Sequence, residues 1–294
     1  MKKLLILLFS LLISLNSHSE TICVETDVQN IDGIYYLPNM TKPFTGENLC
    51  KFENGQNKSK GKIKDGKWIG KMTFWYENGK KKREENYKDG KRDGKYTGWY
   101  ANGQKELEGN LKGSIQDGKW IGWDENDQIR WEINYKDDKR DGKFSTWHEN
   151  GQKMQEHNYI NGNFDGKQSD WHKNGQIDLE INYKNGKKDG WVIFWYENGQ
   201  QMSEGQHKND KRVGKLTYWY ANGQKWREGY YKDDKQVGKW TIWYENGQKG
   251  LEKNYKNDKL DGKFTEWHKN GQIKAEATFK DDECVSGDCG FFQE

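Results

Sequence analysis

A period of 24 residues runs through most of this 294-residue chain and constrains its fold more than any other feature. Nine tryptophans recur at this interval, each five residues after a glycine and three residues before an asparagine. They are Trp75, Trp99, Trp123, Trp147, Trp171, Trp195, Trp219, Trp243 and Trp267. Asn54-Gly55 marks a tenth, less regular copy. A fixed period of this length is typical of repeat architectures, in which each unit contacts mainly its neighbours.

Each copy has the pattern of two strands and two turns. In the copy at 94–117, Asn102-Gly103 predicts a two-residue type I′ hairpin turn with positive φ at both central residues. Strand-forming runs at 95–101 and 104–111 flank this turn, and the Asp- and Gly-rich linker at 88–94 is typical of a looser turn. The sequence therefore predicts an all-β fold, an elongated single-layer antiparallel β-hairpin solenoid of about ten 24-residue repeats.

Alternation along the strands divides the repeated residues between two faces. One face is predicted to take the repeated Trp, the residue two before it and a Glu nine after it. The second, more apolar face takes the residue after each Trp, the residue three before it and the Tyr twelve after it. The Glu column includes Glu84, Glu108, Glu156, Glu204 and Glu252. We interpret it as structural, either accepting a hydrogen bond from a turn N–H or paired with the Lys four before each Trp, because carboxylates about 10 Å apart are too widely spaced for a glycosidase pair.

The two ends depart from the period and indicate the domain organisation. Residues 1–19 have a basic start, an apolar run from Leu4 to Leu15 and small residues before Glu20, which is typical of a cleaved signal peptide. The apolar run is too short for a membrane span, and no later run approaches about 20 apolar residues. We expect an N-terminal cap at 20–50, a repeat array at 51–280, and a C-terminal cap or tail at 281–294. The localisation that follows is export to the periplasm, the cell surface or the medium.

Four cysteines lie outside the array, Cys23 and Cys50 near one end and Cys284 and Cys289 near the other. Disulfides are plausible in an exported protein, and four cysteines allow three pairings. We favour Cys23–Cys50 and Cys284–Cys289, since each pair would close one end of the array. A metal site is the rival interpretation, and it would need all four cysteines at one point.

Composition excludes several function classes. Lys and Arg number 49 against 46 Asp and Glu, so net charge gives no argument for a nucleic-acid partner. His148 and His172 stand one repeat apart, too far to share a zinc ion, and we interpret them with His268 as replacements for Tyr. No Ser or Cys stands with a plausible base, and no phosphate-binding loop is present. We therefore expect no cofactor, no metal site and no enzymatic activity.

The aromatic columns allow three interpretations. In a single-layer sheet, aromatic side chains must cover the backbone themselves. Alternatively, part of an aromatic face stays open and stacks on sugars or contacts a protein. The candidate binding aromatics are Tyr76, Tyr100, Tyr196, Tyr220, Tyr244, Trp120 and Trp240.

The segment 87–94, followed by Trp99-Tyr100-Ala101-Asn102-Gly103-Gln104, resembles the bacterial MORN-variant repeat of antitoxin-like and secreted proteins. The resemblance covers about residues 51–280. It implies a β-hairpin solenoid used for interactions, without a defined active site. The expected function is protein–protein interaction in the bacterial envelope or outside the cell. The main alternative is binding of envelope glycan or peptidoglycan, and weaker alternatives are lipid-headgroup association or an antitoxin-like role.

Overall fold

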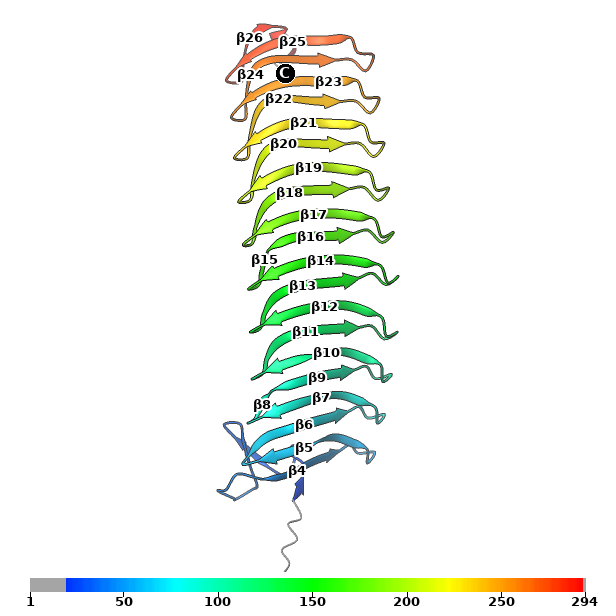
Figure 1. Cartoon of the computed structure of the whole chain (residues 1–294), viewed down its shortest axis with the longest axis vertical. Coiled ribbons are helices and arrows are strands. Elements are labelled where there is room, and N and C mark those ends of the chain that lie inside the picture. Colours follow the sequence, from blue (N-terminus) through cyan, green and yellow to red (C-terminus); the bar gives the residue numbers. More distant parts are fainter. Residues whose placement is uncertain (1–19, 293–294) are drawn as a thin grey trace, which may run out of the picture. The chain divides into compact units, whose positions relative to one another are not determined.

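The computed structural model describes residues 20–292, so the expected signal peptide at 1–19 lies outside the described residues. The chain divides into two compact units, 1–94 and 95–294. Within the described residues every regular element is a strand except one 3₁₀ helix near the C-terminus (Figure 1). The all-β prediction is confirmed.

The first unit contains β1 (Thr21–Ile22), β2 (Gln29–Ile31), β3 (Ile34–Tyr36), β4 (Gly46–Lys51), β5 (Asn57–Lys64), β6 (Lys67–Trp75), β7 (Lys81–Lys88) and β8 (Lys91–Arg92). The second unit begins in β9 (Gly94–Trp99) and continues with β10 (Lys105–Lys112), β11 (Ile115–Trp123), β12 (Ile129–Lys136), β13 (Lys139–Trp147), β14 (Lys153–Ile160), β15 (Asn163–Phe164), β16 (Gly166–Trp171), β17 (Ile177–Lys184), β18 (Lys187–Trp195), β19 (Gln201–Lys208), β20 (Lys211–Trp219), β21 (Lys225–Lys232), β22 (Lys235–Trp243), β23 (Lys249–Lys256), β24 (Lys259–Trp267), β25 (Ile273–Lys280), β26 (Glu283–Gly287) and η1 (Cys289–Phe292).

Strands of the second unit lie side by side in sequence order and form one antiparallel sheet (Figure 1). In the copy at 142–165, Ser145 pairs with Glu156 and Phe144 pairs with His157. Residues directly opposite each other share a face, so the Glu lies with the residue two before Trp147, as predicted. We call this surface the Trp–Glu face. The opposite surface, which carries Phe144 and its equivalents, is the apolar face.

The Asn-Gly turns differ from the prediction. In 148–152, the Gly151 amide donates to the His148 carbonyl oxygen and the His148 amide donates to the Gln152 carbonyl oxygen. Gly151 has φ of 82°, whereas Asn150 is not among the residues with positive φ. A separate register shift lies between Thr146 and Trp147, away from the glycine, and leaves Met154 unpaired in the ladder. This is a three-residue loop with a bulge at glycine, so the predicted two-residue type I′ turn is wrong here.

The reason lies in the asparagine side chain. Asn150 Oδ1 accepts from the Gln152 amide at 3.1 Å, and its Nδ2 donates to the Lys173 carbonyl oxygen of the next copy at 2.7 Å. The same side chain therefore closes its own turn and bonds to the following turn. Equivalent bonds to the next copy are made by Asn102, Asn174, Asn198, Asn222 and Asn246.

The linking turns, expected to be looser, are the two-residue ones. Lys136 pairs with Lys139, and the intervening Asp137 and Asp138 have φ of 48° and 65°. Positive φ at both positions is the geometry of a type I′ turn, which Asp and Asn tolerate better than most residues. Asp138 also exchanges backbone and side-chain hydrogen bonds with Gln116 of the preceding copy. The turns at both ends of the strands in the second unit thus make hydrogen bonds between successive copies.

Replacing Gly151 by Ala isolates the conformational requirement of the Asn-Gly loop. A Cβ added at Gly151 meets no atom within 4 Å, so only the φ of 82° opposes the change. We expect the free energy of unfolding to fall by about 1–2 kcal/mol. Denaturant unfolding of Gly151→Ala measures this, and Gly151→Asn, which tolerates positive φ, should lose less. Equal losses would contradict the assignment.

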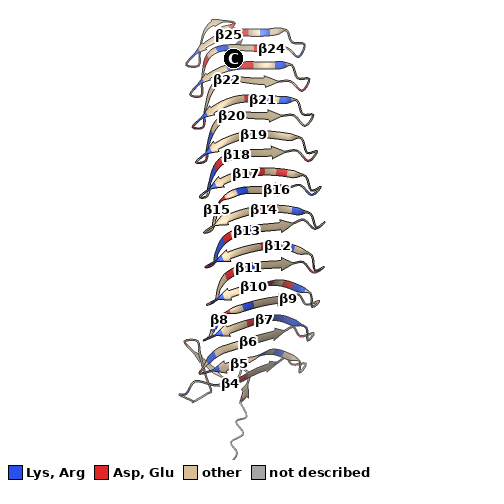
Figure 2. Ribbon diagram, viewed as in Figure 1, with Lys and Arg blue, Asp and Glu red and all other residues tan. Residues whose placement is uncertain are grey.

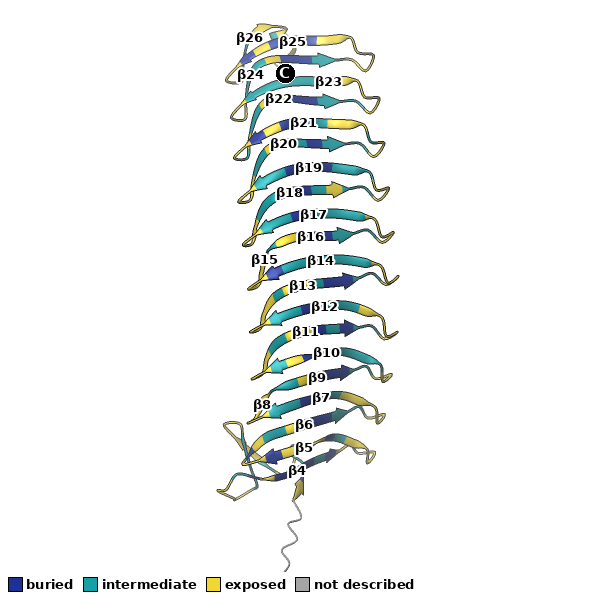
Figure 3. Ribbon diagram, in the orientation of Figure 1, coloured by how far each residue is buried: buried dark blue, intermediate teal, exposed yellow. Residues whose placement is uncertain are grey.

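The core of the second unit lies in the middle of its strands on the apolar face, while the turns are exposed (Figure 3). Trp120 and Trp240 are 5% and 1% exposed. A Cβ added at Gly109 or Gly229, the residues on the neighbouring strands, would lie 2.0 Å from the indole of Trp120 or Trp240. These glycines therefore let each indole lie directly on the adjacent backbone, which accounts for the low exposure.

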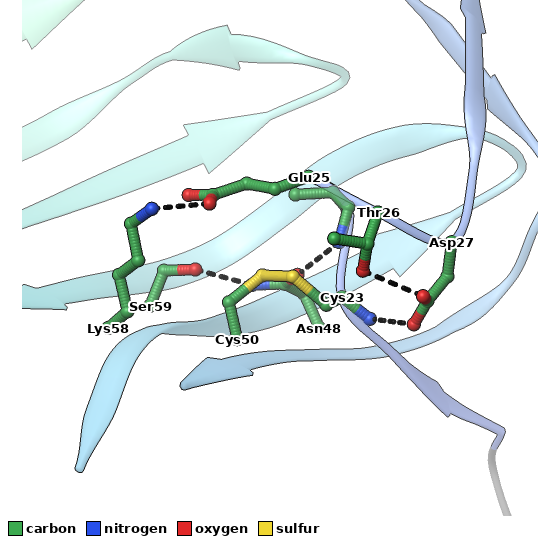
Figure 4. The surroundings of a disulfide bond; sticks show 9 residues. Cys23, Glu25, Thr26, Asp27, Asn48, Cys50, Lys58 and Ser59 are labelled. Atoms are coloured by element: carbon green, nitrogen blue, oxygen red, sulfur yellow. Dashed lines mark hydrogen bonds and ion pairs between the residues drawn. A yellow bond between two sulfur atoms is a disulfide. The ribbon is translucent and has the colours of Figure 1, made fainter. Parts of the chain in front are cut away.

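The first unit begins with a cap held by a disulfide between Cys23 and Cys50 (Figure 4). Strand β1 pairs in parallel with β4, and the fully buried Asn48 accepts from the Val24 amide and donates to Ser59. A second disulfide joins Cys284 and Cys289 at the end of the second unit. Both favoured pairings are confirmed, and the rival metal interpretation is wrong because all four thiols are in these bonds.

Candidate functional site

Ion pairs recur from copy to copy on the Trp–Glu face, and Lys and Arg are interspersed with Asp and Glu along the strands and turns (Figure 2). In the copy at 142–165, Glu156 pairs with Lys143, four residues before the Trp, at 2.9 Å. Lys153 contacts the other carboxylate oxygen at 2.5 Å. The same pairing of the Glu with the Lys four before the Trp is made by Lys71–Glu84, Lys95–Glu108, Lys119–Glu132, Lys167–Glu180, Lys215–Glu228, Lys239–Glu252 and Lys263–Glu276.

The lysine six residues after a Trp has a second contact. The ammonium group of Lys153, which binds Glu156, also lies 5.5 Å from the ring centroid of Trp171 in the next copy. The same contact joins Lys105 to Trp123, Lys225 to Trp243 and Lys249 to Trp267 at 5.3, 5.6 and 5.6 Å. An ammonium over an indole face is attracted by the ring quadrupole. In these four copies carboxylate, ammonium and indole thus form one cluster, which we call the repeated unit of this face.

Two lysines around one carboxylate change its titration. The hydrogen bond from Lys153 lowers the pKa of Glu156, burial opposes it, and Lys143 lowers it further. Burial by itself would raise the pKa of Glu84, Glu108, Glu228 and Glu252, but their two lysines lower it overall. These carboxylates are therefore ionised and bound at neutral pH.

This pairing predicts a pH-dependent contribution to stability. The folded-state pKa of Glu156 lies below its ordinary value of 4.5, so its contribution is present above about pH 4.5 and is lost as pH falls through the folded value. We expect Glu156→Gln to be less stable than the parent by less than about 1 kcal/mol at neutral pH. The difference in stability between Glu156→Gln and the parent should disappear below about pH 4.5, as measured by thermal unfolding scans. A gap that stays constant would show that the charge of Glu156 does not contribute.

The tyrosines proposed as binding residues make bonds within the sheet. Tyr100 donates its hydroxyl to the Trp123 carbonyl oxygen of the next copy at 2.7 Å. Tyr196, Tyr220 and Tyr244 make the same bond at 2.8 Å to Trp219, Trp243 and Trp267. In the first unit, the Tyr76 ring lies 5.5 Å from the Lys82 ammonium group. In Tyr100, Tyr196, Tyr220 and Tyr244 the hydroxyl therefore joins successive copies.

Histidine replaces tyrosine in this column without loss of the bond. His148 Nε2 lies 2.9 Å from the Trp171 carbonyl oxygen, and His172 Nε2 lies 3.2 Å from that of Trp195. The imidazole therefore supplies the donor that tyrosine supplies elsewhere. Among the described residues, no group of three or more His, Cys, Asp or Glu is placed to hold a metal ion.

Trp120 and Trp240, also proposed as binding residues, are too buried to stack on a ligand. The remaining aromatic column, formed by Trp75, Trp99, Trp147, Trp195, Trp243 and their equivalents, is half-buried on the Trp–Glu face. Column parity predicted which face each residue takes. It did not predict which aromatics stay accessible, because accessibility depends on the residue that lies opposite on the neighbouring strand.

The structure exposes other aromatics that sequence reasoning missed. Trp191, Trp226 and Tyr230 are 42%, 42% and 45% exposed. Trp191 stands where the other eight copies have the Lys that binds Glu, and Tyr230 stands where most copies have Asn. They could have been found in the sequence by looking for positions where one copy differs from the other copies.

Comparison with known proteins agrees with the architecture. The MORN repeat variant model matches residues 68–89, 92–112, 116–137, 140–161, 164–185, 212–233, 236–257 and 260–281. No curated protein matches the sequence. No helix in residues 20–292 is long and apolar enough to cross a membrane.

Solved structures of toxin complexes show a weak likeness. They include the crystal structure of TcdB2-TccC3, that of TcdB2-TccC3-TEV, and the Tc holotoxin pore of Photorhabdus luminescens. Their chains are 10%, 9% and 9% identical, with TM-scores of 0.20, 0.20 and 0.19. The alignments cover 85%, 88% and 88% of this chain and 16% of each of those chains. At these TM-scores the likeness carries no argument about function. The eight matched copies span more than half of the sequence, and the chain belongs to the MORN repeat variant family.

Proposed function

We propose that this chain is an exported, non-enzymatic scaffold that binds another protein through its sheet in the bacterial envelope or outside the cell. The observation that carries the proposal is the use of the repeated polar columns. The Glu, Lys, Tyr and Asn side chains bind one another or neighbouring copies, as in Lys143–Glu156 and Tyr196–Trp219. The repeated side chains therefore hold the sheet together, and the residues that differ from the repeat are the ones free to bind a partner.

Export is supported by the two disulfides and by the pattern of residues 1–19. Mass spectrometry of the protein recovered from its native host is the direct test. We expect a mature chain that begins at Glu20 and carries both disulfides. Retention of residues 1–19 with four reduced cysteines would contradict export.

Protein binding is tested with a photo-crosslinking residue placed at the exposed Tyr230. Ile129, which is 37% exposed on the same sheet, is the matched control position. We expect a crosslinked product with an envelope protein at position 230 and much less at 129. Equal products at both positions, or none at either, would contradict binding at the departures from the repeat.

The alternative partner is a glycan, favoured by the exposed rings of Trp191, Trp226 and Tyr230. Aromatic faces pack against the CH-rich face of sugar rings. A glycan array probed with residues 20–294 distinguishes the two. A specific sugar signal that disappears on replacing Trp226 by Ala would favour the glycan and count against the protein scaffold.

A further inference from the structure

We infer that the copy at 190–213 binds a lysine side chain of a partner protein on the Trp–Glu face, between Glu204 and the indoles of Trp191 and Trp219. The inference rests on the proposed function and specifies one contact of it.

The first observation is that this copy lacks both lysines of the repeated unit. Trp191 replaces the Lys four before the Trp, and Gln201 stands six after it, where five copies have Lys and three have Ile. Among the described residues Glu204 has no ion pair, and its carboxylate accepts from Gln201 Nε2 at 3.1 Å. The other eight carboxylates of the column each bind a lysine of their own copy. The family model matches the copies at 164–185 and 212–233 and omits the segment between them.

The second observation is the aromatic surface around this carboxylate. Trp191, Ile193 and Trp195 alternate along β18 and therefore share the Trp–Glu face. Ile193 pairs with Glu204, and Trp191 pairs with Gln206. Trp191 is 42% exposed, so its ring is open to a partner. Gln201 and Trp219 stand at the positions that Lys153 and Trp171 hold in the copy at 142–165 and the next one. The Trp219 indole therefore has a glutamine where Trp171 has a lysine.

The chain itself defines the ligand chemistry. In the copy at 142–165, one ammonium group lies within 2.5 Å of the Glu carboxylate and 5.5 Å from the next indole. The copy at 190–213 keeps the carboxylate and the indole but supplies glutamine in place of the ammonium. An external ammonium therefore finds the charge and the ring that lysine uses elsewhere on this sheet.

The apolar stripe favours lysine over a small amine. The four-carbon stem of lysine packs on apolar surface while its ammonium group reaches a polar partner, and Trp191 and Ile193 supply such a surface. The flanking Lys167 and Lys215 are bound to Glu180 and Glu228. The ammonium groups of both flanking copies are therefore already held by carboxylates of their own copies.

The test uses residues 20–294 and Nα-acetyl-lysine methylamide as the probe, followed by the indole N–H signals in NMR spectra. We expect saturable shifts of the Trp191 and Trp219 signals. The same probe with its ε-amine acetylated should give no shift, because acetylation removes the charge. Gln201→Lys, which introduces the lysine that five other copies have at this position, should weaken binding at least tenfold, and Glu204→Gln should do the same.

Ile129→Lys is the matched control, since it adds a lysine at the same column of a distant copy and should leave the affinity unchanged. Thermal unfolding of each variant verifies that the sheet is intact. Shifts spread equally over all tryptophans, or affinity unchanged in Gln201→Lys, would overturn the inference. A failed lysine titration beside a positive crosslink at position 230 would refute this site alone. Failure of the crosslink with a positive titration would instead refute the scaffold.

Discussion

Replacing Trp240 by Ala is expected to lower the free energy of unfolding of the second unit by about 3–5 kcal/mol. The Trp240 indole is 1% exposed and lies on the backbone of Gly229. Its ring centroid is 5.2 Å from that of Tyr231, and the Arg227 guanidinium lies 4.4 Å from the ring. Truncation removes these contacts and leaves a cavity that the facing glycine cannot fill.

Denaturant unfolding of the second unit, with hydrogen exchange to locate the loss, measures this effect. Trp226→Ala is the matched control, because Trp226 lies on the adjacent strand β21 and is 42% exposed. Its loss should stay below about 1 kcal/mol, as for surface substitutions. Similar losses for the two variants would mean that Trp240 is not part of a packed core.

The second large effect concerns the N-terminal disulfide. Cys23 and Cys50 are 27 residues apart, and the chain-entropy model gives about 3–4 kcal/mol for a closed loop of that length. We expect the Cys23→Ala, Cys50→Ala double variant to lose this amount from the stability of the cap. Alanine is chosen over serine because Cys50 is 1% exposed and a serine hydroxyl would be buried there. Hydrogen exchange of β1 and β4 should rise most.

The C-terminal disulfide provides the comparison. Cys284 and Cys289 are 5 residues apart, for which the same model gives about 2 kcal/mol. The Cys284→Ala, Cys289→Ala variant should therefore lose less, with increased exchange confined to β25 and β26. A larger loss at this end than at the N-terminal end would contradict the loop-length argument.

The sequence was sufficient for features that repeat within one copy or between adjacent copies. The positions of strands and turns and the face of each residue follow from local pattern, and the 24-residue period brings equivalent residues of successive copies close together. The pairing of Glu156 with Lys143 could be predicted because a fixed register places both on one face. The disulfides followed because each cysteine pair lies at one end of the array.

The turn types could not be assigned from the same pattern. Asn-Gly favours a type I′ turn when it is isolated, but Asn150 here bonds to Lys173 of the next copy and stabilises a three-residue loop instead. The two-residue geometry goes to Asp137-Asp138 and its equivalents, whose backbone contacts the preceding copy. At both ends of the strands, hydrogen bonds between copies outweigh the local preference of the sequence for a turn type.

The sequence by itself determined the all-β repeat, the division of residues between two faces and the cysteine pairs. Only the tertiary structure decided which aromatics are accessible. Trp240 is buried because Gly229 lies across from it, whereas Trp191 is exposed on the opposite face. The two tryptophans belong to the same kind of strand, and their burial differs because it is set by the face and by the residue on the neighbouring strand.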